Sequence, residues 1–259
     1  MTTTTRFKRH DRTGKNGKTW HYYMLDGKRA DGVTTLISGG LPKPALLRWA
    51  PKMVAAYVAD NPGAVNALWS GNRDQMVREL KEVPWSQRDA AAAKGTEVHA
   101  LAERLSRGEE IEVPEALEGY VNSAVAFLDE WRVRPLQTEV AVANRQWGYA
   151  GTADVLAELG GRTVLMDYKT SRSGIYGETA LQLAAYSRAE VYLDADDHEQ
   201  PMPTIDAAYA VWLRPDGYNV YAMDISESVY KAYLHVAYVA RQAKQLDSWI
   251  SDALELPHV

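Results

Sequence analysis

The chain has 259 residues, 46% of them hydrophobic, which is enough to bury a core in one large domain or two small ones. Cysteine is absent, which excludes disulfides, thiolate zinc sites, cysteine nucleophiles and iron–sulfur clusters held by cysteine. The net charge of −5 does not indicate a nucleic-acid-binding protein. Because the chain has no apolar run typical of a transmembrane helix or a signal peptide, we expect a soluble, cytoplasmic protein.

The first 30 residues carry a net charge of +6, opposite in sign to that of the whole chain. Such a surplus could contact nucleic-acid phosphates, although charged runs more often simply face water. Acidic residues gathered in a metal site would make the negative total compatible with DNA binding. The basic residues are Arg6, Lys8, Arg9, Arg12, Lys15, Lys18, Lys28 and Arg29, against the acids Asp11 and Asp26.

Residues 19–37 are expected to form a β-hairpin, with a turn at Asp26-Gly27 and β-type composition again at Val33–Ile37. Helices are expected over residues 45–59, where Pro51 interrupts or kinks the helix, and over 64–82. An alanine-rich helix is expected over 87–107, with Thr96 as an alternative start. Another helix is expected over 114–131.

The hydrophobic period then changes to that of strands, expected at 139–143, 151–159 and 162–170, with Gly160-Gly161 as a tight turn. These strands are followed by a helix over 179–192 and by strands over 205–213 and 218–225. A C-terminal helix capped by Ser226 is expected last. This order predicts an α/β or α+β fold with a helical N-terminal part.

The segment from 151 to 169 contains a group of charged side chains. Asp167 and Lys169 are two residues apart on one strand and point to the same side, and Asp154 lies on the neighbouring strand. Carboxylates beside an apolar run must be paired or hold a metal, and hard oxygen ligands suit Mg²⁺ or Mn²⁺. Such a metal and lysine could support phosphodiester hydrolysis. The alternative is an ordinary Asp–Lys ion pair on a sheet.

Two weaker signals accompany these residues. Gln182 and Tyr186 share one helical face and could touch a substrate or the lysine, although on their own they are better explained as a solvated glutamine and a core tyrosine. His99 is alone on an alanine-rich helix, where a histidine usually has no special role.

Taken together, four segments resemble the PD-(D/E)XK nuclease superfamily, and within it the RecB-like exonucleases. The resemblance covers about residues 95–190, and the stretches 32–36, 41–44 and Trp49 resemble phage-encoded members. It implies a restriction-endonuclease-like core over residues 87–259, with a mixed central sheet flanked by helices, after an N-terminal hairpin and helical region over residues 1–86. The segments are Gly95-Thr-Glu-Val-His99, Gly151-Thr-Ala-Asp154, Asp167-Tyr-Lys-Thr-Ser171 and Gln182-Leu-Ala-Ala-Tyr186.

The resemblance also implies roles for single residues. One or two Mg²⁺ or Mn²⁺ ions would be held by Asp154, Asp167, the backbone carbonyl of Tyr168 and His99. Lys169 would be the catalytic lysine, Gln182 and Tyr186 would help to place the scissile strand, and Glu139 would be an outer acid. Because the chain has no cysteine, it would lack the iron–sulfur cluster of several relatives. It also has no phosphate-binding loop for ATP-driven unwinding.

The function expected from this resemblance is a metal-dependent DNA exonuclease of phage recombination, replication or repair, working in the host cytoplasm. Its partners would be the ends of single- or double-stranded linear DNA, and a recombination or single-strand-annealing protein is a further candidate. No association with a membrane is expected. A structure-specific or nicking endonuclease on the same core is an alternative. A non-catalytic DNA-end-binding protein is another, but it would not need Asp154, Asp167 and Lys169 together.

Overall fold

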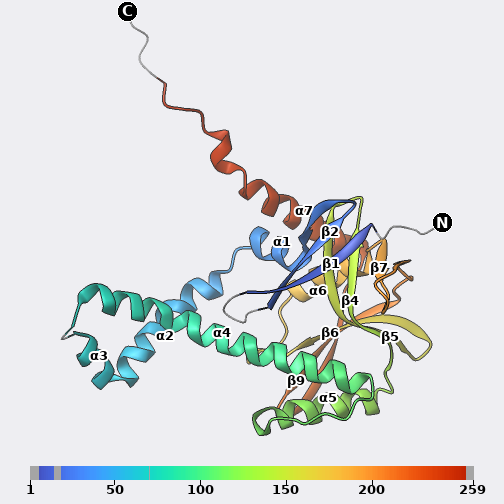
Figure 1. The fold of residues 1–259 in the computed structure, drawn as a ribbon, viewed down its shortest axis with the longest axis horizontal. Helices are drawn as coiled ribbons and strands as arrows, with labels where there is room; N and C mark the ends of the chain where they lie inside the picture. The colour runs from blue at the N-terminus through green and yellow to red at the C-terminus, as the bar shows by residue number, and fades with distance from the viewer. Residues whose placement is uncertain (1–5, 15–18, 70, 255–259) are drawn as a thin grey trace, which may run out of the picture. The chain divides into compact units, whose positions relative to one another are not determined.

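The structure is a computed structural model that describes residues 6–14, 19–69 and 71–254 (Figure 1). The chain divides into two compact units, one formed by residues 1–41 with 101–259 and the other by residues 42–100. The larger unit contains helices and a mixed sheet, which confirms the expected α+β class. The expected boundary between residues 86 and 87 differs from this division, because the N-terminal strands belong to the larger unit.

Three short strands begin the larger unit: β1 (Phe7–Thr13), β2 (Thr19–Leu25) and β3 (Lys28–Gly32). They form an antiparallel meander, and the turn between β2 and β3 has Asp26 at φ 49° and Gly27 at φ 77°, as a tight hairpin requires. Part of the basic N-terminal stretch is therefore the strand β1, at an edge of the sheet. Lys15 and Lys18 of that stretch lie outside the described residues.

The centre of the sheet is the antiparallel set β4 (Arg134–Asn144), β5 (Tyr149–Leu159) and β6 (Arg162–Lys169), as the sequence predicts. Strand β9 (Ala207–Arg214) pairs in parallel with β6 and antiparallel with β10 (Gly217–Met223), which makes the sheet mixed. The N-terminal meander joins through a parallel pair between β3 and β5.

Two further strands, β7 (Val191–Leu193) and β8 (Glu199–Pro201), extend the sheet beyond β4. The helix expected over 179–192 is shorter, because α6 (Glu178–Ser187) ends before β7. The backbone N–H of Glu190 donates a hydrogen bond to Ala143 O of β4, and Val191 then pairs with the same strand. The chain therefore leaves the helix to continue the sheet.

Helices α1 (Val33–Gly40), α6 and α7 (Glu227–Ala243) share one core with residues of β4, β5 and β6. The expected strand at Val33–Ile37 is wrong. Val33, Leu36 and Ile37 are buried at helical spacing, so their burial outweighs the β-propensity of Val33 and the two threonines that follow. Helix α1 also needs glycine at position 40, because a Cβ there would lie 2.1 Å from Val236 O of α7.

The short helix η1 (Glu115–Leu117) and helix α5 (Glu118–Glu130) follow the first helical region, in agreement with the helix expected over 114–131. Phe127 of α5 packs edge-on against the rings of Tyr168 on β6 and Tyr218 on β10. Helix α5 therefore covers this part of the sheet. The short helix η2 (Leu246–Trp249) follows α7 near the C-terminus.

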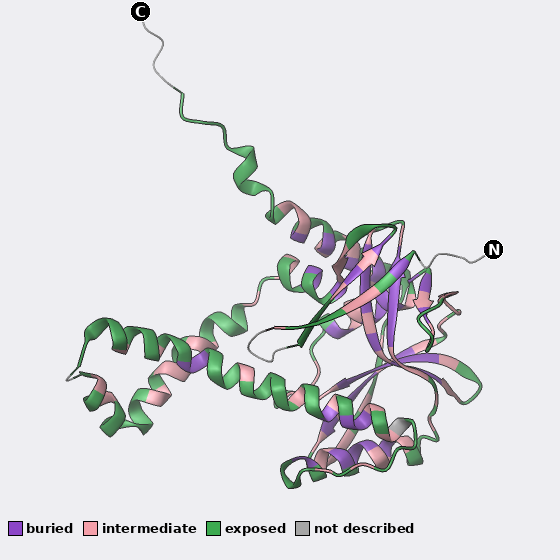
Figure 2. Cartoon of the chain, in the orientation of Figure 1, coloured by how far each residue is buried: buried purple, intermediate pink, exposed green. Residues whose placement is uncertain are grey.

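The smaller unit contains α2 (Pro44–Asp60), α3 (Pro62–Trp69) and most of α4 (Arg73–Ser106). Helix α4 runs unbroken past Gly95, so Thr96 does not start a helix; its hydroxyl donates to Ala92 O instead. All residues of α2 and α3 are described and none is buried, as the green and pink ribbon of Figure 2 shows. Over the described part of the chain, no helix is both long and apolar enough to cross a membrane.

Candidate functional site

Three carboxylates lie level with one another on neighbouring strands. The β4–β5 pairs Thr138↔Val155 and Val140↔Ala153 place Glu139 opposite Asp154. The β5–β6 pairs end at Val155↔Met166, and the next level holds Asp154 and Asp167. Strand pairing therefore brings together acids that are far apart in sequence, at the point where β5 and β6 begin to separate.

Asp167 is the most buried of these acids, with only 2% of the residue exposed. Its Oδ1 accepts a hydrogen bond of 2.8 Å from Gln182 Nε2, and its Oδ2 lies 2.5 Å from Lys169 Nζ. Oδ2 accepts no hydrogen bond of normal geometry from any described residue, so the lysine charge is its main compensation. Lys169 also donates a 3.4 Å hydrogen bond to Gln182 Oε1. Gln182 thus contacts both charged groups.

Asp154 accepts a 2.7 Å hydrogen bond from the backbone N–H of Tyr168. Burial raises the pKa of Asp154 well above its ordinary value, and the negative charge of Asp167 raises it further, while Lys169 and the Tyr168 N–H act in the opposite direction. A buried acid whose ionisation is disfavoured by burial and by a neighbouring carboxylate is typical of a site that takes up a proton or a cation.

Glu139 has a backbone that is unusual for a strand residue, with φ at 49°. A residue other than glycine in this region costs about 1–3 kcal/mol and is more frequent at functional sites than elsewhere. Burial also raises the pKa of Glu139, against the opposing effect of Arg9. A third, partly buried acid with a strained backbone therefore lies at the level of Asp154.

The ring of Tyr186 packs directly on the backbone of Gly151, which explains the glycine in the segment Gly151-Thr-Ala-Asp154. A Cβ at position 151 would lie 2.4 Å from Tyr186 Cε1 and 3.0 Å from the hydroxyl oxygen. Tyr186 is 2% exposed, and its hydroxyl accepts a 3.4 Å hydrogen bond from Gln182 Nε2. Tyr186 is therefore a packing support for Gln182, and its role in placing the scissile strand stays a prediction.

A cleft of about 570 Å³ opens beside Asp154. Glu139, Gln182 and Tyr186 line it from the central part of the fold, and β2, β3 and the start of α1 form the opposite wall. Sequence reasoning did not assign this wall to the site, because it comes from distant strands, although residues 32–35 within it belong to a stretch that resembles phage-encoded members. The wall residues include His21, Tyr22, Tyr23, Arg29, Asp31, Thr34 and Thr35. A larger cavity of about 740 Å³ near Arg162 and Asp224 is lined by none of the predicted site residues.

The predicted site residues divide between the two units. The structure brings Asp154, Asp167, Lys169, Gln182 and Tyr186 together in the larger unit. His99 lies on α4 in the smaller unit, partly buried, and its role as a ligand stays a prediction. The Tyr168 carbonyl likewise stays a predicted ligand, beside the Tyr168 N–H that Asp154 binds.

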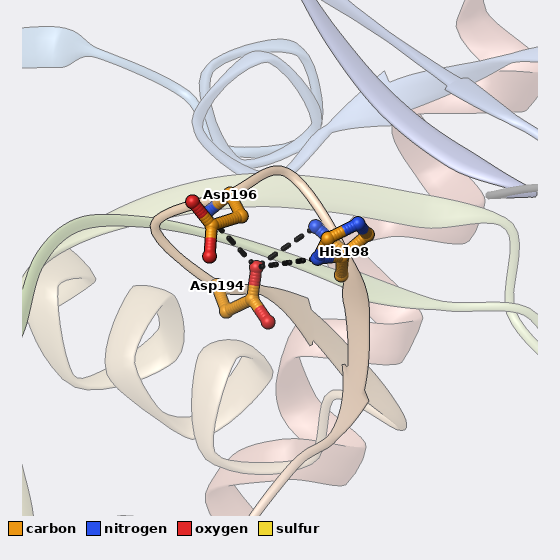
Figure 3. Close-up of side chains that lie close together, drawn as sticks. All are labelled: Asp194, Asp196 and His198. Carbon is orange, nitrogen blue, oxygen red and sulfur yellow. Dashed lines mark hydrogen bonds and ion pairs between the residues drawn. The ribbon is translucent and has the colours of Figure 1, made fainter.

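A second group of metal-type side chains, Asp194, Asp196 and His198, lies in the turn between β7 and β8 (Figure 3). Their potential ligand atoms lie within 4.8 Å of one another. Hydrogen bonds explain this arrangement, since Asp194 Oδ1 accepts the backbone N–H groups of Asp196 and His198 and Oδ2 accepts Gln200 Nε2. Asp196 and His198 are exposed, and we interpret the group as a hydrogen-bonded turn.

Comparisons with known proteins do not identify this chain. No family model matches it, and no curated protein matches it. One solved structure with similarity is the crystal structure of SSO0001, at 16% identity over 54% of this chain and 63% of that one, with a TM-score of 0.27. The match thus spans less than two thirds of that protein, and similarity at this level does not support any inference about function.

Proposed function

We propose that this chain is a metal-dependent DNA nuclease of the PD-(D/E)XK type that degrades DNA from its ends. The observation that carries the proposal is the contact set of Asp167, buried beside Asp154 and joined to both Lys169 and Gln182. An ordinary surface ion pair needs neither a second, buried acid beside it, here Asp154, nor a glutamine that contacts both partners. The resemblance of four sequence segments to RecB-like exonucleases supports the same conclusion.

The residues present fit a divalent cation. Asp154 and Asp167 are hard oxygen donors of the kind that Mg²⁺ and Mn²⁺ prefer. Burial and then the negative charge of Asp167 raise the pKa of Asp154, and a cation would offset both effects by stabilising the ionised carboxylate. Asp154 and Asp167 would hold the ion, with Glu139 at the same level. Such an ion supplies an activated water and offsets charge on a phosphate.

The side chains around these acids have separate tasks in this proposal. Lys169 Nζ, which is 30% exposed, can orient the attacking water or stabilise negative charge on the phosphate in the transition state. Gln182 holds Lys169 and Asp167 in fixed relation, and Tyr186 packed on Gly151 holds Gln182. The site is therefore built on strands and one helix, which position reacting groups more accurately than loops do.

The preference for DNA ends follows from the absence of a base-reading motif in the sequence. Contacts to phosphates carry no direct sequence information, so a nuclease that relies on them needs another restraint on where it cuts. The requirement for a free end is the simplest such restraint.

The experiment that tests the proposal is digestion of linear and covalently closed circular DNA, single- and double-stranded, with Mg²⁺, Mn²⁺ or EDTA. We expect linear DNA to be degraded with either metal, closed circles to survive, and EDTA to stop the reaction. Asp167→Asn is the matched control, because it removes one charge at nearly constant volume. Full activity in EDTA would contradict the metal-dependent mechanism. Rapid cutting of closed circles would favour the endonuclease alternative. Metal-independent binding to DNA ends without cleavage would favour the non-catalytic DNA-end-binding protein.

A further inference from the structure

Arg9 differs from the other described basic residues near it on β1. Its side chain is 23% exposed, whereas Lys8 and Arg12 are exposed on the same strand. Residue pairing between β1 and β2 sets Arg9 opposite Tyr23, which lines the cleft beside Asp154. The meander therefore carries the Arg9 guanidinium to the candidate site, in addition to Arg29 of β3, which lines the cleft.

One edge of this guanidinium is anchored to the site. Arg9 Nη1 donates to Glu139 Oε2 and to Thr152 Oγ1, both at 3.2 Å. Thr152 is also 2.8 Å from the hydroxyl of Tyr23. Glu139 lies level with Asp154, and Thr152 precedes Asp154 by two residues on β5. These contacts hold the guanidinium against Glu139 and Thr152, at the level of Asp154.

The other edge binds an anionic oxygen already. Nε and Nη2 of Arg9 both lie 3.2 Å from Asp11 Oδ1. This Nε/Nη2 edge is the side of a guanidinium that can bind a phosphate through two parallel N–H donors. Asp11 is 66% exposed, and exposed ion pairs contribute little stability, so an incoming phosphate could displace it readily.

We propose that Arg9 binds a phosphate of the DNA strand beside Asp154, and that Asp11 occupies this position while DNA is absent. The proposal rests on the nuclease function proposed above. The charges at the site favour it, because a nucleic acid would bring further negative charge to the level where Glu139, Asp154 and Asp167 gather. A cation anchored to one of these acids lowers the repulsion that an approaching phosphate meets.

The test measures binding separately from cleavage. A short fluorescein-labelled linear duplex is titrated with full-length protein in EDTA over a series of KCl concentrations, and Kd is obtained from anisotropy. Arg9→Gln should weaken binding about tenfold or more and reduce the log–log salt slope by about 0.9. Asp11→Ala should strengthen binding by up to about fivefold, because it frees the guanidinium edge. Arg134→Gln is the matched control, since Arg134 also pairs with an exposed acid, Glu158, at 3.3 Å.

The outcomes separate this inference from the nuclease proposal. The role of Arg9 would be overturned if Arg9→Gln and Arg134→Gln lost DNA affinity equally, or if Asp11→Ala bound DNA more weakly than wild type. The nuclease proposal would be unaffected by either result, provided that the wild-type protein cleaves DNA. A wild-type protein that neither binds nor cuts DNA would overturn both. If Arg9→Gln does not fold, as judged by thermal melting, the Arg9→Lys variant tests the proposal instead. That variant keeps the charge and loses the paired donors, so we expect lower affinity with an unchanged salt slope, and wild-type affinity would contradict the proposal.

Discussion

Gly151→Ala tests whether packing at the back of the site controls its chemistry. The added Cβ would lie 2.4 Å from Tyr186 Cε1, whereas non-bonded carbon atoms separate by about 3.5–4.0 Å. The ring must therefore move by roughly 1 Å. Because Tyr186 is 2% exposed, it has little room to do so. Overpacking of this kind costs about 1–3 kcal/mol of the free energy of unfolding.

The expected result has two parts. The melting temperature should fall by roughly 2–12 °C, since a chain of this size loses about 2–4 °C for each kcal/mol. Displaced Tyr186 should also move Gln182, which holds Asp167 and Lys169, and a shift of about 1 Å near reacting groups can reduce the rate about a hundredfold. Calorimetry gives the first quantity, and the initial rate of DNA degradation with Mn²⁺ gives the second.

Gly177→Ala is the matched control. No atom lies within 4 Å of its would-be Cβ, and its φ of −59° suits alanine, so stability and rate should stay near wild type. The double variant Gly151→Ala with Tyr186→Leu should lose less stability than the sum of the single variants, because leucine vacates part of the ring's space. A Gly151→Ala protein that melts and cleaves like wild type would refute the reasoning.

Three further predictions concern charges. Lys169→Ala should abolish cleavage but still bind metal, as measured by calorimetry, whereas Asp167→Ala should lose both cleavage and metal binding. If the Lys169→Ala protein cleaves DNA at the wild-type rate, Lys169 has only a structural role. The raised pKa of Asp154 contributes stability below the unfolded value of 3.8 that is lost as the pH rises through the folded pKa. In EDTA at pH 8, Asp154→Asn should therefore melt above wild type, and a lower melting temperature would contradict this. Burial acts to raise the pKa of Asp31, but hydrogen bonds from Arg241 and Lys244 outweigh it and lower the pKa. Asp31→Asn should therefore destabilise the protein at pH 7, with the difference from wild type shrinking in urea titrations as the pH falls below 3.8.

Local signals account for what could be predicted. The Gly160-Gly161 turn has φ values of 57° and 77°, and the alternation of its flanking residues sets the β5–β6 register that brings Asp154 level with Asp167. The helical spacing of Gln182 and Tyr186 gives their shared face, but only the structure shows that Tyr186 is buried against Gly151. That contact depends on the distance between β5 and α6, which no local pattern encodes.

Non-local pairing accounts for what was missed. Arg9 reaches Glu139 across 130 residues of sequence, so nothing near either residue indicates their contact. Helix α1 was expected as a strand because Val33, Thr34 and Thr35 favour strands, and only the buried face of Val33, Leu36 and Ile37 reveals the helix. The strained backbone of Glu139 has no signal in the sequence.

The long separation in sequence between β1 and the residues it contacts in the site also has a consequence during translation of the chain. During translation at 5–20 residues per second, roughly 7–26 s pass between the appearance of Arg9 and that of Glu139, 130 residues later. Over that interval the nascent meander of β1, β2 and β3 cannot bury Tyr23 and Phe7 in their native core, which includes Ala141 and Ala150. Exposed strand edges of this kind tend to pair with other chains, and charged residues on the edge suppress such pairing. Lys8, Arg9 and Arg12 of β1 would thus protect the growing chain from aggregation before the site exists.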